Sequence, residues 1–160
     1  MMKVAYRKAT KKDIPVIQSF IRELAAYEKL EHEVVATEDL LEKTLFGDRP
    51  YAEVIIAEAD KKEAGFVLFF HNYSTFLARP GIYIEDLYVR PEYRGKGIGK
   101  GLLSHISSLA LERGCGRVEW WVLNWNPARS FYDSIGAKAM DEWVVYRLTG
   151  DKLKKLASSG

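Results

Sequence analysis

The sequence predicts a mixed α/β fold built on a central sheet. Strand-like and helix-like segments alternate along the 160 residues, and the helix-like segments have one apolar face. A strand-like run at 82–89, a helix-like run at 99–113 and a strand-like run at 117–123 follow one another, which is typical of parallel strands joined by a crossover helix. Hydrophobic residues make up 48% of the chain, so we expect residues 1–160 to form a single domain.

Local signals define the elements of the first half. Thr10 followed by Asp13 resembles a helix start, and Thr37 precedes a second apolar helical pattern that Gly47 and Pro50 end. Two strand-like runs flank a polar turn at 60–63, which predicts an antiparallel hairpin. The expected elements are a strand at 4–7, helices at 11–27 and after 37, and strands at 53–58 and 65–71.

Local signals also define the elements of the second half. The helix at 99–113 should pack on the sheet through its apolar face and end at Gly114. After the strand at 117–123 we expect a short helix at 127–135 ended by Gly136, a last strand at 143–148 and a small helix at 151–157.

Composition excludes several classes of protein. The 24 Lys and Arg residues nearly balance the 22 Asp and Glu residues, so a net charge of +2 favours neither nucleic acid nor membrane partners. The single Cys115 excludes an internal disulfide framework and suits a reducing compartment. Neither a long apolar run nor a signal-peptide pattern is present, so we expect a cytoplasmic protein. The three histidines lack metal-ligand spacing, so we expect no metal.

The segment Arg94-Gly95-Lys96-Gly97-Ile98-Gly99-Lys100-Gly101 stands between a predicted strand and a predicted helix. Helix N-termini leave about four N–H groups unpaired, and glycines let a bulky anion approach them. The spacing fits neither the nucleotide P-loop nor the dinucleotide fingerprint. The remaining pattern, R-x-x-G-x-G, indicates a turn that holds a phosphate, although a plain glycine-rich turn with solvated lysines has the same composition.

Two motifs together resemble the GNAT superfamily of acyl-CoA-dependent N-acetyltransferases. The first is Arg94 to Gly99, and the second is Asn126 to Tyr132 followed by Gly136-Ala137. Within the superfamily, the first 148 residues or so resemble the spermidine/spermine-type diamine acetyltransferases and their thialysine-acetylating relatives. The segments that carry this resemblance are 23–28, 83–89, 93–95 and 122–126.

The resemblance implies a twisted mixed sheet that splays between the strands at 82–89 and 117–123, with acetyl-CoA as co-substrate and a homodimer as the assembly. The residues that it assigns to acetyl-CoA are Leu87, Tyr88, Val89, Arg94, Gly95, Lys96, Gly97, Ile98, Gly99, Lys100, Asn126, Ala128 and Arg129. The chain has one residue fewer than related enzymes between Trp125-Asn126 and Phe131-Tyr132, which leaves open whether Asn124 or Asn126 caps the following helix.

Acetyl transfer to an amine needs a base, an acid for the departing thiolate and a donor to the carbonyl oxygen. By resemblance, Glu85 is the candidate base and Tyr132 the candidate acid, and a main-chain N–H near Leu87 is the candidate donor. Side chains alternate along a strand, so Glu85 and Asp86 can serve one cavity only if the strand bulges between them. The resemblance implies such a bulge, and we treat Asp86 as the weaker substrate contact.

The expected substrate is a small cationic amine. Acidic residues crowd the first two helical segments, which would attract a cation, although solvated helix faces are often acidic without a function. At least two of the four tryptophans should lie in the core, and Glu119 with Trp121 is the better site pair on its strand. The candidate substrate residues are Tyr27, Glu28, Glu85, Asp86, Glu119, Trp121 and Trp143.

Two other interpretations stay open. The acceptor amine could belong to a lysine or N-terminus of a protein, which would need a shallower acidic groove. The domain could instead bind acyl-CoA without acetylating anything, or bind nucleic acid through its basic loop. Against the last interpretation, the basic residues of the glycine-rich segment sit in one loop without stacking aromatics.

Overall fold

The computed structural model describes residues 1–160. Contacts divide the chain into two compact units, a first unit Met1–Trp121 and a second unit Val122–Gly160, and each is described by itself. The predicted mixed α/β class is confirmed, because the first unit contains a five-stranded mixed sheet with helices packed on it. No helix is long and apolar enough to cross a membrane.

The sheet has its strands in sequence order, from β1 to β5. Neighbouring strands pair antiparallel except β4 and β5, which are parallel as the sequence predicts. Asp60 and Lys61 form the turn between β2 and β3 with φ of 49° and 67°, the backbone geometry of a tight hairpin. The strands are β1 (Val4–Lys8), β2 (Glu53–Ala59), β3 (Lys62–Ser74), β4 (Arg79–Val89) and β5 (Val118–Trp120).

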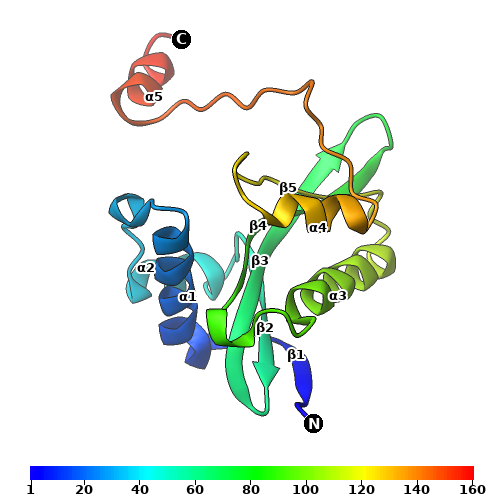
Figure 1. Ribbon diagram of the computed structural model, residues 1–160. Helices are drawn as coiled ribbons and strands as arrows, with labels where there is room; N and C mark the ends of the chain where they lie inside the picture. The colour runs from blue at the N-terminus through cyan, green and yellow to red at the C-terminus, as the bar shows by residue number, and fades with distance from the viewer. The chain divides into compact units, whose positions relative to one another are not determined.

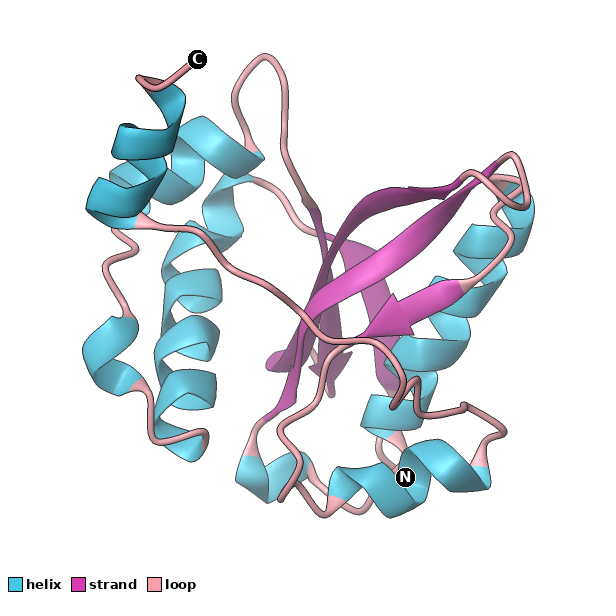
Figure 2. Cartoon of the chain, turned by 90° about the horizontal axis from the view of Figure 1, so that it is seen from above, coloured by secondary structure: helices cyan, strands magenta, loops and turns pink.

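Helices cover both faces of this sheet (Figures 1 and 2). α1 (Ile14–Tyr27) and α2 (Glu38–Leu45) lie on one face, and α3 (Ile98–Glu112) lies on the other. Three short 3-10 turns complete the unit, at Lys11–Asp13, Glu31–Glu33 and Pro91–Tyr93. The sheet is therefore the middle of three layers.

Side chains alternate between the two faces of the sheet, so each face packs its own apolar side chains against the helices that cover it. On the α1 face, Phe20 stacks on Phe66 at 5.1 Å between ring centroids and also contacts Tyr88 at 6.2 Å. On the α3 face, the fully buried Leu102 and Ile106 follow helical spacing, and α3 contacts β3 and β4. Burial of these large side chains is the main stabilising contribution to the first unit.

The helix starts follow the predicted signals. The Thr37 hydroxyl accepts a hydrogen bond from the Leu40 amide at 3.2 Å, so Thr37 caps α2. Asp13 accepts a bond from the Thr10 amide at 2.7 Å and two from the Arg7 guanidinium at 2.8 Å each. The bidentate Arg7 pair holds the pKa of the buried Asp13 below its usual value, which fixes β1 against the start of α1.

The second unit contains α4 (Ala128–Ser134) and α5 (Gly150–Ala157), and none of its residues is buried. The predicted strand at 143–148 is wrong, because this segment has no regular structure. Alternating apolar residues indicate a strand only where a neighbouring strand supplies hydrogen bonds, and no ladder includes this segment. β5 is likewise shorter than the predicted 117–123.

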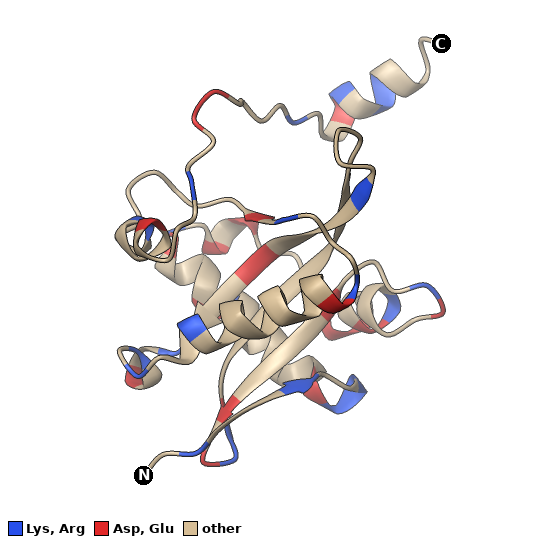
Figure 3. Cartoon of the chain, turned by 90° about the vertical axis from the view of Figure 1, so that its right-hand side faces the viewer, with Lys and Arg blue, Asp and Glu red and all other residues tan.

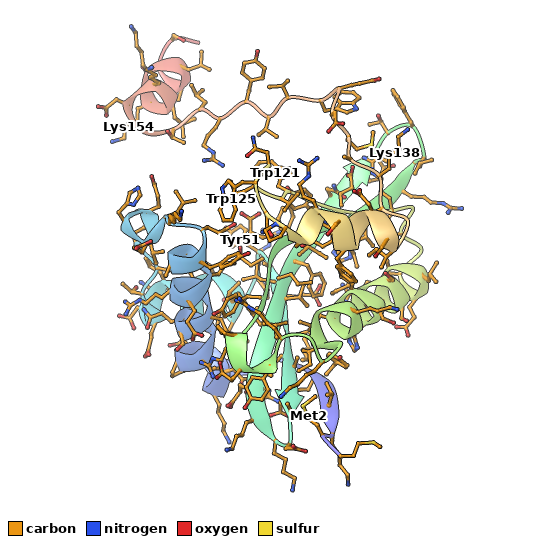
Figure 4. The ribbon with its side chains drawn as sticks, viewed as in Figure 1. Met2, Tyr51, Trp121, Trp125, Lys138 and Lys154 are labelled. Atoms are coloured by element: carbon orange, nitrogen blue, oxygen red, sulfur yellow. The ribbon has the colours of Figure 1, made fainter.

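The expectation that at least two tryptophans lie in the core is also wrong. Trp120 is half-buried, and Trp121, Trp125 and Trp143 are exposed by 56%, 50% and 74%. β5 is the last strand of the sheet and has only β4 beside it, so the rings at its end are not enclosed from both sides. In Figure 4 the labelled Trp121 lies where β5 ends.

Candidate active site

The glycine loop joins β4 to α3 in the predicted way. Gly95 and Gly97 have φ of 73° and 82°, in the left-handed region that favours glycine, and Gly97 is the residue just before α3. The first bond inside α3 runs from the Gly101 amide to the Gly97 carbonyl at 2.9 Å. The six amides from Gly95 to Lys100 donate no hydrogen bond, so this turn presents a run of N–H groups at the positive end of a helix.

The side chain of Arg94 ties the loop to the end of β4. Its Nε donates to the Val89 carbonyl at 2.8 Å. Its guanidinium lies 5.1 Å from the centroid of the Tyr27 ring and 5.5 Å from that of Tyr88. Two residues expected at different subsites, Tyr27 and Arg94, are thus in contact. The loop's direction is therefore set by α1 as well as by β4.

The side chains of other residues that the resemblance assigns to acetyl-CoA lie at the surface or in the core. Lys96 lies over the ring of Tyr93 at 5.8 Å, and Lys100 is exposed on the first turn of α3. Tyr88 places its side chain in the α1 core, so only its backbone is open to a ligand. These lysines add positive charge beside the row of amides.

The strand bulges at the candidate base, as the sequence argument required. Leu68 pairs with Asp86 and Phe69 pairs with Ile84, so Glu85 is the extra residue of β4. Tyr83 and Asp86 consequently lie on the same face of the sheet, the face that α1 covers farther along. Glu85 itself is exposed, whereas Asp86 is largely buried.

The same strand loses its parallel partner at this point. β4 pairs with β5 only through Ile82, Tyr83 and Ile84, and the ladder ends there. From Glu85 to Val89, β4 continues without pairing to β5. This is the splayed sheet that the resemblance implies, and it leaves the edge of β4 near Leu87 without a ladder on that side.

Three carboxyl groups meet beside the bulge. Burial, together with the charges of Glu85 and Glu28, raises the pKa of Asp86 to about 7. Burial also raises the pKa of Glu28, which follows the last turn of α1. Figure 3 shows acidic positions on the central strands among uncoloured ones. The cluster disfavours a full set of negative charges, so a bound cation would relieve it.

A second polar group lies one strand away. Glu119 pairs with Tyr83 in the β4–β5 register, and its Oε1 contacts Arg117 Nε at 3.0 Å and Asn72 Nδ2 at 3.1 Å. The Tyr83 ring lies between Phe70 at 5.2 Å and Trp121 at 5.8 Å. Glu119 and Trp121 are predicted site residues, whereas the sequence pattern indicates no role for Tyr83 and Asn72. The spacing of Tyr83 two residues before Glu85 was the available signal.

The acidic residues of α1 and α2 do not form one continuous surface. Glu23 binds the Arg90 guanidinium at 3.1 Å and accepts a bond from the Tyr88 hydroxyl at 3.3 Å, so it joins α1 to β4. Glu42 pairs with Lys11 at 3.6 Å. Of this group, Glu28 is the member whose charge acts on Asp86.

The remaining candidates belong to the second unit. The N-cap residue of α4 is Pro127, which makes no side-chain capping bond. The Asn126 side chain, one residue earlier, accepts a hydrogen bond from the Ala128 amide at 2.9 Å, so Asn126 and not Asn124 contacts the start of α4 through its side chain. Arg129 donates to the Asn124 carbonyl at 3.1 Å. Tyr132 lies on α4 with its ring 5.8 Å from that of Phe131. Trp143 lies in the irregular segment before α5.

The described residues contain no group of three or more His, Cys, Asp or Glu side chains that could hold a metal ion. Two surface hollows, of about 440 and 210 Å³, contain none of the candidate catalytic residues. The first lies along α3 beside Tyr6, and the second lies between α2 and β2. The candidate site is defined instead by the bulge and the loop.

Comparisons with known proteins point to one family. The Acetyltransferase (GNAT) family matches residues 17–137. An L-ornithine N5-acetyltransferase of Arabidopsis thaliana is 37% identical, over 94% of this chain and 86% of the relative. A thialysine N-epsilon-acetyltransferase of Bos taurus is 36% identical, over 96% of this chain and 97% of the relative.

A solved structure is similar over the whole chain. An integron cassette protein from the mobile metagenome of V. cholerae superposes with a TM-score of 0.81 and 32% identity, covering 98% of both chains. The fold, the loop and these relatives define an acyltransferase enzyme. The chain belongs to the GNAT family of N-acetyltransferases.

Proposed function

We propose that this protein transfers an acetyl group directly from acetyl-CoA to a small primary amine. The acceptor is a polyamine, a diamine or a thialysine-like amino acid. The observation that carries the proposal is the turn between β4 and α3, where six consecutive amides have no acceptor and two left-handed glycines keep side chains out of the way. The acetyltransferase relatives agree with the chemistry.

The loop residues fit the pyrophosphate of CoA. A Cβ at Gly95 or Gly97 would meet nothing within 4 Å, so the space beside these amides is open to a ligand. N–H groups at the start of a fifteen-residue helix bind phosphate oxygens well, and Lys96 and Lys100 add positive charge. Asn126, Ala128 and Arg129 are the candidates of the second unit for the rest of the cofactor. CoA supplies the acetyl group as a thioester.

The acceptor amine must lose a proton before it attacks. A lysine-like amine has a pKa near ~10.4, so holding it neutral at pH 7 costs about 4–5 kcal/mol unless a base helps. We assign this base to the exposed Glu85, directly or through a water molecule. A main-chain N–H near Leu87 donates to the carbonyl oxygen, and the Tyr132 hydroxyl supplies a proton to the departing sulfur.

The carboxyl cluster supports a cationic acceptor. A bound ammonium near Asp86 offsets the repulsion among Glu28, Glu85 and Asp86, and the Asp86 proton would leave as the amine binds. The relatives act on ornithine and on thialysine, both of which carry a primary amine at the end of a short chain. The tryptophan at the end of β5, Trp121, offers an aromatic wall to that chain.

A homodimer remains the expected assembly. The C-terminal segment exposes several large apolar side chains, including Val144 by 75% and Tyr146 by 94%, and none of its residues is buried. Exposed apolar groups of this kind favour association. Light scattering after gel filtration should give twice the 18.3 kDa of the chain. A mass of one chain at micromolar concentration would contradict the dimer.

The decisive experiment measures CoA release from acetyl-CoA with a panel of diamines, polyamines, ornithine and lysine analogues. We expect release with at least one small amine and none with buffer. If no small amine reacts but peptides with a lysine or a free N-terminus do, the protein acetylates proteins. If acetyl-CoA binds by calorimetry without any turnover, the chain is an acyl-CoA-binding module.

A further inference from the structure

Two buried side-chain atoms of the protein have no hydrogen-bond partner, and both lie beside Glu119. They are Oδ1 of Asn72 and the hydroxyl oxygen of Tyr83. Asn72 donates to Glu119 through its other amide atom, and Tyr83 stands opposite Glu119 in the sheet. Buried polar atoms are nearly always paired, so two unpaired atoms at one place indicate a requirement other than stability.

The Tyr83 ring is packed between two other rings, while its buried hydroxyl has no hydrogen-bond partner. Phe70 on β3 and Trp121, the residue after β5, contact the ring with centroids at 5.2 and 5.8 Å. Burial, with the charges of Glu85 and Glu119, raises the pKa of Tyr83 well above its usual value. The hydroxyl therefore keeps its proton and can both donate to a carboxylate and accept from an ammonium.

Tyr83 has a carboxylate on either side, Glu85 and Glu119, and a substrate with two ammonium groups can contact both. Glu85 follows it on the same strand, and Glu119 is its partner on β5. The rise along a strand and the spacing between strands place these two Cα atoms roughly 8 Å apart. Arg117 and Asn72 make their nearest contacts with the same oxygen of Glu119, Oε1.

We propose that Tyr83 is a specificity-determining residue, whose hydroxyl accepts a hydrogen bond from the distal ammonium of a two-amine substrate while Glu119 balances its charge. The inference rests on the proposed function, because the reacting amine is placed at Glu85. It adds a requirement for a second cationic group about five chain atoms from the first. The ring of Tyr83 forms the floor beneath the aliphatic chain.

The test variant is Tyr83→Phe, which removes only the hydroxyl. The probes are 1,5-diaminopentane and pentylamine, which share a chain length and differ in the distal ammonium. For 1,5-diaminopentane we expect KM to rise about tenfold with kcat unchanged, the effect of a lost bond to a charged group. For pentylamine we expect no change. Tyr73→Phe is the matched control, because Tyr73 is 61% exposed on β3 and alternates with Asn72 onto the other face of the sheet.

Thermal unfolding separates this role from a structural one. Removing an unpaired buried hydroxyl should raise the Tm of Tyr83→Phe by about 2–4 °C, even as binding of the diamine weakens. A loss of Tm, or an equal change in KM for both probes, would overturn the proposal and leave the acetyltransferase function standing. So would a wild-type protein that uses pentylamine as well as the diamine, or that rejects 1,5-diaminopentane but accepts other amines. Absence of CoA release with every amine would overturn the proposed function itself.

Discussion

The first unit and the second unit hold their candidate residues on different physical terms. In Met1–Trp121, the bulge at Glu85 is part of a sheet whose two faces are packed by helices, and the glycine loop joins that sheet to α3. In Val122–Gly160, Tyr132 and Trp143 belong to segments without a single buried residue. Backbone pairing and packing therefore fix the candidate residues of the first unit. The candidate side chains of the second unit are not fixed by packing within that unit.

The largest expected contrast concerns stability. Phe20→Ala removes a ring stacked on Phe66 in the α1 core and should lower the free energy of unfolding by about 3–5 kcal/mol. Tyr146→Ala in the second unit, where the ring is 94% exposed, should change it by less than about 0.5 kcal/mol. Urea titration followed by circular dichroism measures both. Similar losses for the two variants would mean that the second unit has a core of its own.

The second contrast concerns pH. The folded-state pKa of Asp86 is about 7 against an ordinary 3.8, so the folded protein binds this proton more tightly than the unfolded chain. Stability from this group is complete below about pH 4 and falls as pH rises to about 7, by up to roughly 4 kcal/mol. Asp86→Asn should remove this fall. Urea titrations from pH 5 to 8 measure the free energy of unfolding of the wild type, of Asp86→Asn and of the exposed control Glu142→Gln. If this free energy changed with pH equally in all three proteins, the assignment to Asp86 would be contradicted.

The third contrast compares one catalytic candidate from each unit. Glu85→Gln and Tyr132→Phe should each lower kcat by about 10²–10³-fold and leave the affinity for acetyl-CoA unchanged. Raising the pH toward the pKa of the acceptor amine should restore part of the activity of Glu85→Gln, because the neutral amine then forms without a base. Tyr132→Phe should not recover. Steady-state kinetics from pH 6 to 10 tests this, and parallel loss of cofactor binding in both variants would refute the assigned roles.

The smallest expected effect distinguishes two glycines of equal geometry. Gly97 and Gly136 have φ of 82° and 89°, and a Cβ at either position would meet nothing within 4 Å. Replacement by Ala should cost each about 1–2 kcal/mol of stability through backbone strain. Gly97→Ala alone should also raise the KM for acetyl-CoA, by about tenfold, because the methyl group stands beside the free amides. Equal KM values for the two variants would contradict the assignment of the glycine loop to acetyl-CoA binding.

Much of the first unit could be predicted because its signals are local. Thr37 caps its helix through its hydroxyl, Gly97 adopts the left-handed conformation that glycine favours, and Asp60-Lys61 closes the hairpin between two strand-like runs. The bulge at Glu85 followed from a conflict between strand alternation and the resemblance to diamine acetyltransferases. The structure confirms the bulge.

Failures of prediction fall where the outcome depends on a distant partner. The segment 143–148 has a strand-like pattern but no ladder, and Trp120 and Trp121 lie where β5, the last strand of the sheet, ends. Glu23 looked like part of an acidic surface until Arg90 and Tyr88 were found to hold it. No local pattern reports these pairings.

The sequence alone determined the order of the strands and helices, the phosphate-type turn and the family, because backbone preferences and motif spacing are written residue by residue. Only the tertiary structure decided which acids act together. Packing of α1 on β4 buries Asp86 beside Glu28 and raises its pKa to about 7. The β4–β5 register sets Tyr83 opposite Glu119. Desolvation and charge repulsion depend on distances through space, which a one-dimensional pattern does not contain.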